Sequence, residues 1–239
     1  MSFFCNKHHW LLYIFDSVIT IFILFFALPF FLFLPILIKI DSYGPVFYTQ
    51  IRIGKNRRFS GNQKAVLTEK RKVNKRGRPF RVYKFRTMHV NAESRCGPVH
   101  AIKNDPRITN VGRSLRKYRI DKIPQLWNVL KGDMSFIGLQ AVRPEVYNNI
   151  NFKIPDYEER FTLRPGLIGL GQLCSMNNEN PEYKTNQLEF DRILLSGLTF
   201  RTWMMMYYFA FLKVLRGRPV DSRVFSAKLN SGKELHENV

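Results

Sequence analysis

The sequence is poor in the residues that build disulfide frameworks and zinc sites. It contains three cysteines and five histidines in 239 residues. Cys5, Cys96 and Cys174 lie far apart and match neither a disulfide framework nor paired metal-ligand spacing, which predicts free thiols in a reducing compartment. The histidines also lack zinc-type spacing. The composition therefore argues against both a disulfide-stapled secreted domain and a structural zinc domain.

Acidic residues are also scarce. Lysine and arginine number 38 against 18 aspartates and glutamates, a formal net charge of +20. Such an excess predicts an anionic partner, which is nucleic acid, an acidic membrane face or a phosphorylated substrate. No helix-turn-helix, zinc-finger or RNA-binding signature accompanies the charge, so we expect no nucleic-acid partner. The 45% hydrophobic content, with no linker to divide the chain, predicts a single globular unit with a membrane attachment.

The longest apolar run extends from Trp10 to Ile38, and Asp16 is its only ionisable residue. No cleavage site of the signal-peptide type follows it, so we expect it to be retained. As a straight helix it would be about 43 Å long, which exceeds the roughly 30 Å of a bilayer core. Pro29 and Pro35 predict a bend near Pro29, and a re-entrant helix and a spanning helix both remain open. The lysines and arginines that follow place the body of the protein in the cytoplasm.

The rest of the chain predicts an α+β fold that is mostly helical. Residues 45–50 and 80–86 have β-like composition, and residues 60–78 form a basic segment typical of an exposed loop that could contact anionic lipid. Residues 164–172 predict a glycine-rich turn, and residues 182–195 an amphipathic helix.

Two further segments have more than one interpretation. Apolar residues recur at helical spacing through 104–138, which predicts a helix, a sharp break and a second helix, with Asp121 at the break. An aspartate there can cap a helix or act in catalysis, and the composition favours capping. The apolar stretch 203–215 is too short to span a membrane and predicts either an interfacial helix or a core helix.

Several stretches occur in an order that resembles the bacterial sugar transferase family of monotopic phosphoglycosyl transferases. The resemblance covers nearly the whole chain. It rests on Asp16 with Pro29, residues 41–47 (DSYGPVF), 84–88 (KFRTM), 91–93 (NAE), 103–109 (KNDPRIT), Gly112-Arg113, Leu115-Arg116 and 124–135 (PQLWNVLKGDMS).

The resemblance implies transfer of a sugar 1-phosphate from a UDP-sugar to polyprenol (undecaprenyl) phosphate, through a covalent aspartyl intermediate. It implies that Asp121 is the nucleophile and a ligand of Mg²⁺. It also implies that Lys84, Arg86, Arg116 and Arg143 bind the substrate.

The same resemblance implies a location and a domain plan. We expect a bacterial inner-membrane protein, exposed on the cytoplasmic face, that begins synthesis of an exopolysaccharide, lipopolysaccharide or capsule. Residues 1–40 would form the membrane-anchoring helix, re-entrant by analogy because Pro29 matches the family's proline, although Leu28 replaces a neighbouring serine. Residues 41–220 would form the catalytic domain with its basic insertion at 60–78, and residues 221–239 a flexible tail. Membrane lipids are expected partners, and homo-oligomer formation stays open.

Two positions depart from the family pattern. Lys122 replaces the glutamate that most members place after the aspartate, and Gln140 replaces an arginine. An ammonium 4 Å from a divalent ion would be repelled by about 8 kcal/mol at an effective dielectric constant of 20. Lys122 therefore points away, or its ammonium takes over part of the metal's role, or the site has lost catalysis. In the last case the protein would act as a membrane-bound binding or assembly protein.

Overall fold

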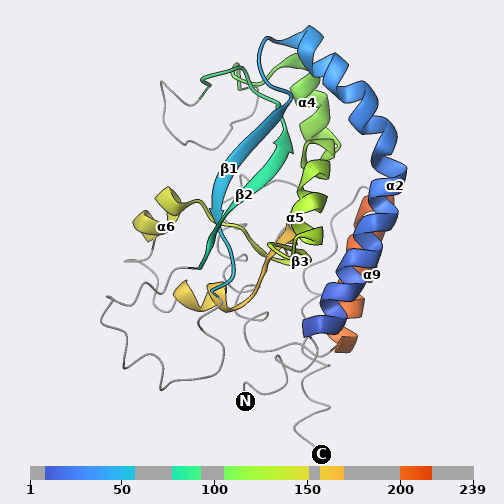
Figure 1. The fold of residues 1–239 in the computed structure, drawn as a ribbon, viewed down its shortest axis with the longest axis vertical. Coiled ribbons are helices and arrows are strands. Elements are labelled where there is room, and N and C mark those ends of the chain that lie inside the picture. The colour runs from blue at the N-terminus through green and yellow to red at the C-terminus, as the bar shows by residue number, and fades with distance from the viewer. Residues whose placement is uncertain (1–8, 57–76, 93–104, 151–156, 170–199, 217–239) are drawn as a thin grey trace, which may run out of the picture.

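The computed structural model describes residues 9–56, 77–92, 105–150, 157–169 and 200–216. These residues form a mixed, mostly helical fold, as the sequence predicts. Figure 1 shows a β-hairpin on one side of a row of short helices and a long curved helix on the other. In chain order the elements are α2 (His9–Asp41), β1 (Phe47–Ile53), β2 (Pro79–Phe85), α4 (Asn110–Lys117), η2 (Ile120–Gln125), α5 (Leu126–Leu130), β3 (Ser135–Gln140), α6 (Pro144–Ile150), η3 (Tyr157–Thr162), β4 (Pro165–Gly169) and α9 (Phe200–Arg216).

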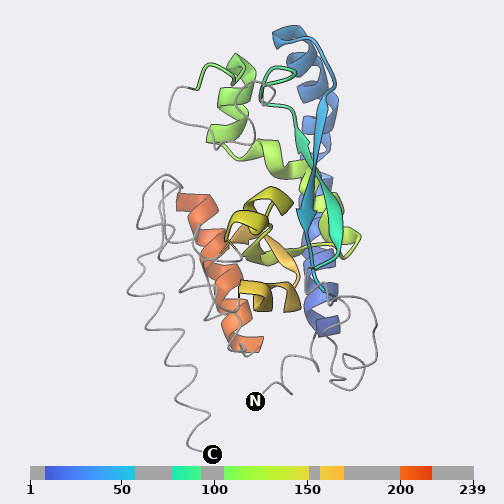
Figure 2. The ribbon, with the colours of Figure 1, turned by 90° about the vertical axis from the view of Figure 1, so that its left-hand side faces the viewer.

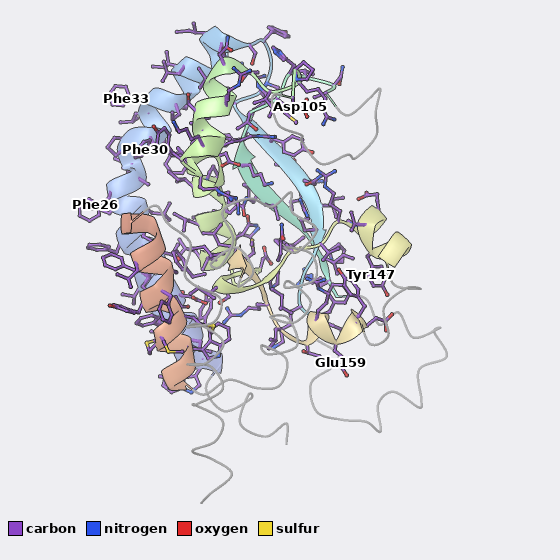
Figure 3. All side chains as sticks on the ribbon, turned by 180° about the vertical axis from the view of Figure 1, so that it is seen from behind. Phe26, Phe30, Phe33, Asp105, Tyr147 and Glu159 are labelled. Atoms are coloured by element: carbon purple, nitrogen blue, oxygen red, sulfur yellow. The ribbon has the colours of Figure 1, made fainter. Side chains whose placement is uncertain are left out.

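Helix α2 exposes a long apolar surface. Its 33 residues continue through Pro29 and Pro35, and Figure 1 shows the helix curving along its length. Within the part of the chain that the structure describes, it is the one helix long and apolar enough to cross a membrane. Phe26, Phe30 and Phe33 point away from the rest of the molecule (Figure 3). This exposed face is consistent with membrane association, while the choice between a re-entrant and a spanning helix stays a prediction.

The opposite face of α2 packs on the body of the protein. Its buried residues recur at helical spacing and are Asp16, Thr20, Ala27, Leu34 and Ile38. The Asp16 carboxylate accepts hydrogen bonds from Ser135 Oγ at 2.7 Å, from the Phe136 N–H at 3.1 Å and from the Tyr207 hydroxyl. The only ionisable residue of the apolar run therefore attaches α2 to β3 and α9.

The two strands predicted at 45–50 and 80–86 are confirmed as β1 and β2. They pair antiparallel, from Phe47 opposite Phe85 to Ile53 opposite Pro79. Side chains alternate between the two faces of a strand, so this register puts Arg52 and Lys84 on the same face of the hairpin. Most of the predicted basic loop 60–78 and the whole predicted helix 182–195 lie outside the described residues.

The predicted glycine-rich turn at 164–172 is wrong over its described part, because Pro165–Gly169 is strand β4, which pairs in parallel with β3. The glycines serve the close approach of these strands. A Cβ atom built on Gly166 would lie 2.1 Å from the Gly138 backbone nitrogen, a separation that no side chain tolerates.

Helix α9 is a core helix with one exposed side. Met206, Tyr207, Phe209 and Ala210 are buried in a cluster with two residues of β3. Tyr208 and Phe211 remain more than half exposed. Figure 2 shows α9 on the side of the β3–β4 sheet opposite the hairpin. Of the two interpretations of residues 203–215, the core helix describes the packing better.

A buried asparagine joins the helices to the hairpin. Asn128 on α5 is fully buried, and its Nδ2 donates to the Arg81 carbonyl at 2.7 Å. Its Oδ1 accepts from the Tyr83 N–H at 3.2 Å. One side chain thus satisfies a donor and an acceptor of β2 and fixes the position of that strand against α5.

We predict that Asn128→Ala lowers the free energy of unfolding by about 2–4 kcal/mol, because it leaves a partly buried donor and a partly buried acceptor of the β2 backbone unpaired. Thermal unfolding in detergent would measure the loss. The matched control is Asn110→Ala on the exposed side of α4, which we expect to change stability by less than about 0.5 kcal/mol. An unaltered unfolding temperature in Asn128→Ala would contradict this account.

Candidate active site

The predicted helix, break and helix are confirmed around Asp121. Helix α4 ends at Lys117, Arg119 adopts a left-handed conformation with φ of 61°, and the short 3-10 helix η2 begins at Ile120. Asp121 lies in the first turn of η2, which has no side-chain capping hydrogen bond. Among the described residues the Asp121 carboxylate has no hydrogen bond or ion pair, so the capping interpretation is wrong. In the described part of the chain, the break therefore presents a carboxylate that interacts with nearby cations without a hydrogen bond or an ion pair.

Helix η2 shares a hydrophobic cluster with the apolar helix. Ile120 and Ile123, on either side of Asp121, pack against a cluster that includes Leu34 and Ile38 of α2. The Asn128 contacts hold the adjoining helix α5 against β2. Asp121 is thereby positioned between the apolar helix and the hairpin.

Two lysines share the environment of Asp121. Burial, and then the charge of Arg52, lowers the pKa of Lys84 to about 8, while Asp121 acts in the opposite direction. Burial lowers the pKa of Lys122 to about 7, with further contributions from Arg119 and Lys84, again opposed by Asp121. Each lysine is therefore affected by the other positive charges and by this one carboxylate.

Two arginines complete the predicted set around Asp121. Arg116 Nε donates to Thr87 Oγ1 at 2.8 Å, which orients the guanidinium. Burial lowers the pKa of Arg116, and the charges of Asp121 and Asp105 oppose that effect. Arg143 lies near enough to lower the pKa of Lys84. Lys84 and Arg116 thus lie within electrostatic range of the predicted nucleophile, and Arg143 lies within range of Lys84.

Arg86 has a different environment from the one its predicted substrate role requires. It is 5% exposed, and its Nη atoms donate to the carbonyl groups of Ile38 at 3.2 Å, Ser42 at 2.6 Å and Tyr43 at 2.8 Å. These bonds satisfy carbonyl groups at and beyond the end of α2. The geometry gives Arg86 a structural role, so we leave it out of the proposed site.

Lys122 does not point away from the site. Its Nζ donates to the Leu167 carbonyl at 3.5 Å, and its charge interacts with Lys84 and Asp121. Gln140, the other departure from the family pattern, lies at the end of β3, where its carbonyl accepts from Arg160 Nη2 at 3.1 Å.

Sequence reasoning missed Arg52 as a member of the site. Its Nη1 donates to the Ala141 carbonyl at 2.7 Å, and its charge lowers the pKa of both Lys84 and Lys122. Strand alternation could have placed it on the Lys84 face only if the pairing register had been known, and register depends on the tertiary fold. The result is a partly exposed carboxylate, Asp121, in a site that also contains five cations: Arg52, Lys84, Arg116, Lys122 and Arg143. This arrangement suits attack on a phosphorus atom, because the negative charge of the phosphate oxygens must be neutralised.

We predict that Lys84→Met stabilises the protein at pH 7 by about 1–3 kcal/mol, because it removes a buried cation. The pKa of Lys84 falls from 10.5 to about 8 on folding, so native stability rises with pH between these values and the advantage of the variant disappears by pH 10.5. Thermal unfolding at pH 7 and pH 10.5 would measure this. Lys117→Met, at an exposed position, is the control for loss of one charge. A stability difference between Lys84→Met and the native protein that increases with pH would contradict the prediction.

Comparisons with known proteins identify a family for this chain. The family described as bacterial sugar transferase matches residues 7–217. The chain is 36% identical over 165 residues to the exopolysaccharide production protein PSS of Rhizobium leguminosarum bv. phaseoli, covering 66% of this chain and 71% of that protein. It is 33% identical over 179 residues to the UDP-glucose:undecaprenyl-phosphate glucose-1-phosphate transferase of Caulobacter vibrioides, covering 74% of this chain and 57% of that protein.

A third relative is the UDP-N-acetylgalactosamine-undecaprenyl-phosphate N-acetylgalactosaminephosphotransferase of Aeromonas hydrophila, 41% identical over 138 residues. That alignment covers 58% of this chain and 28% of the Aeromonas protein, so much of the length of some relatives lies outside the shared region. The family match extends over most of the chain and includes every residue of the cation cluster around Asp121. The chain belongs to the bacterial sugar transferase family.

Proposed function

We propose that this protein transfers a sugar 1-phosphate from a UDP-sugar to undecaprenyl phosphate at the cytoplasmic face of the bacterial inner membrane, as the first step in building a lipid-linked surface glycan. The observation that carries the proposal is the Asp121 carboxylate, which has no structural partner among the described residues and lies among Lys84, Arg116 and Lys122. A carboxylate that only stabilised the fold would be paired with one of these cations.

The proposed reaction has two displacements at one phosphorus atom. An Asp121 oxygen attacks the phosphorus next to the sugar, the bond to the bridging oxygen breaks, and uridine monophosphate leaves with that oxygen. A phosphate oxygen of the lipid then attacks the same phosphorus and releases the carboxylate. The product is a lipid diphosphosugar.

The chain's own residues contribute mainly charge and position. Negative charge spreads over the equatorial oxygens of a phosphoryl group in transfer, and preorganised cations stabilise it. Lys84, Arg116 and Arg143 are suited to this task, and Thr87 positions Arg116. The names of the relatives mention glucose in one case and N-acetylgalactosamine in another, so they support the reaction class without selecting a sugar.

The exposed face of α2 supports the lipid half of the reaction. A polyprenol chain is confined to the bilayer, so the nucleophile must lie close to the membrane surface. In support of this, Ile120 and Ile123, which flank Asp121 in the sequence, pack against the cluster that contains Leu34 and Ile38 of the helix whose outer face is apolar.

We expect Asp121→Asn to reduce uridine monophosphate release by more than about a thousandfold, because the neutral amide cannot form the acyl phosphate. The assay would use a panel of UDP-sugars with undecaprenyl phosphate. Asp133→Asn, whose carboxylate makes a 3.9 Å surface ion pair with Lys131, is the matched control and should retain native activity.

The covalent step has its own readout. Incubation with labelled UDP-sugar in the absence of lipid should leave label on the native protein and none on Asp121→Asn. Full transferase activity in Asp121→Asn would refute the proposal. If the native protein released no uridine monophosphate from any UDP-sugar of the panel, the result would favour the alternative of a membrane-bound binding or assembly protein.

A further inference from the structure

Divalent ions bind nucleoside diphosphates in proteins through hard oxygen ligands, usually one or two carboxylates together with phosphate oxygens. The described residues contain no group of three or more histidine, cysteine, aspartate or glutamate side chains placed to hold a metal ion. Asp121 is the carboxylate whose charge acts on both Lys84 and Lys122. The nearby Asp105 carboxylate is already bonded to the Arg107 guanidinium, with a shortest contact of 2.6 Å. Within the described residues, the site therefore offers Mg²⁺ a single carboxylate.

The charges around Asp121 oppose a divalent ion. Lys122 follows Asp121 directly in η2, and its Nζ donates to the Leu167 carbonyl, so the ammonium is held within the site. Lys84 and Arg52 interact electrostatically with it. Each of these groups, when charged and 4 Å from a divalent ion, would repel the ion by about 8 kcal/mol at an effective dielectric constant of 20. The residues present do not fit the magnesium site that the family resemblance implies.

The same cations fit a diphosphate. Arg52 and Lys84 lie on one face of the hairpin, while Arg116 and Lys122 approach from α4 and η2. Phosphate oxygens accept hydrogen bonds from ammonium and guanidinium groups, and fixed cations neutralise their charge without a metal. A bound diphosphate also favours the charged forms of Lys84 and Lys122.

We infer that this site binds the diphosphate of a nucleoside-diphosphate sugar without a divalent metal, with the Lys122 ammonium in the place of the ion and Lys84, Arg52 and Arg116 completing the cradle. The inference rests on the proposed function for the identity of the ligand. It assigns Lys122 a substrate-binding role that follows from this chain's departure from the family pattern.

The first test measures UDP binding to the full-length protein in detergent by titration calorimetry, once with EDTA and once with excess Mg²⁺. We expect the two Kd values to agree within about twofold, and the rate of uridine monophosphate release from a UDP-sugar to be equally insensitive to EDTA. Binding or release that disappears in EDTA and returns with Mg²⁺ would overturn the inference. Failure to bind UDP under both conditions would overturn it as well.

The second test changes Lys122 itself. Lys122→Glu should weaken UDP binding in EDTA at least tenfold, and Mg²⁺ should restore part of the affinity, because a second carboxylate then lies beside Asp121. Lys117→Glu makes the same change of charge at an exposed position on α4 and should leave the Kd unaltered. Native affinity of Lys122→Glu in EDTA would refute the role of Lys122. Lys122→Gln, which adds no charge, provides a second variant and should weaken binding in EDTA without gaining a response to Mg²⁺.

The two proposals fail in distinguishable ways. Metal-independent UDP binding without any release of uridine monophosphate would refute the proposed transfer and leave the binding inference intact. Metal-dependent UDP binding together with sugar phosphate transfer would refute the binding inference and leave the proposed transfer intact.

Discussion

The attachment of β2 to the short helices through Asn128 is the constraint on which the candidate site depends. Lys84 belongs to the hairpin, whereas Asp121, Lys122 and Arg116 belong to the helices that follow it. The Asn128 side chain forms hydrogen bonds with both a donor and an acceptor of the β2 backbone, which fixes the position of the strand along α5. A buried amide that satisfies both groups specifies a single alignment, because any shift would leave polar groups unpaired in the interior. The residues of the site meet because this alignment is unique.

The site concentrates positive charge at a cost in stability. Burial lowers the pKa values of Lys84 and Lys122, which means that the folded protein holds their charged forms unfavourably. Asp121 offsets only part of this effect, since it is one carboxylate among several cations. An anionic ligand would supply the missing negative charge. Under the proposed function, phosphate groups of the substrate would supply this charge, and the site would exchange stability for binding.

Helix α2 has two different faces, one packed on the body of the protein and one exposed. On the inner face, the buried Asp16 carboxylate bonds to β3 and α9, and Leu34 and Ile38 belong to a cluster against which Ile120 and Ile123 of η2 pack. The outer face is apolar along its length. The same helix thus combines an exposed apolar surface, consistent with membrane association, with a cluster that also includes neighbours of Asp121. Under the proposed function, this arrangement would let a water-soluble and a lipid-confined substrate reach one carboxylate.

The sequence by itself determined the features that arise from local patterns. Apolar composition identified α2, strand composition identified β1 and β2, and helical spacing with an interruption identified the break at Asp121, because each pattern spans only neighbouring residues. The tertiary structure decided which distant residues meet. In the folded protein, Arg86 donates hydrogen bonds at the end of α2, and the glycine-rich segment allows β4 to pair closely with β3. The tertiary structure also brought Arg52 to Lys84 through a strand register, which local composition does not encode. Charge clusters depend on contacts between separate elements, and for this reason the site could be predicted at Asp121 and completed only in the folded protein.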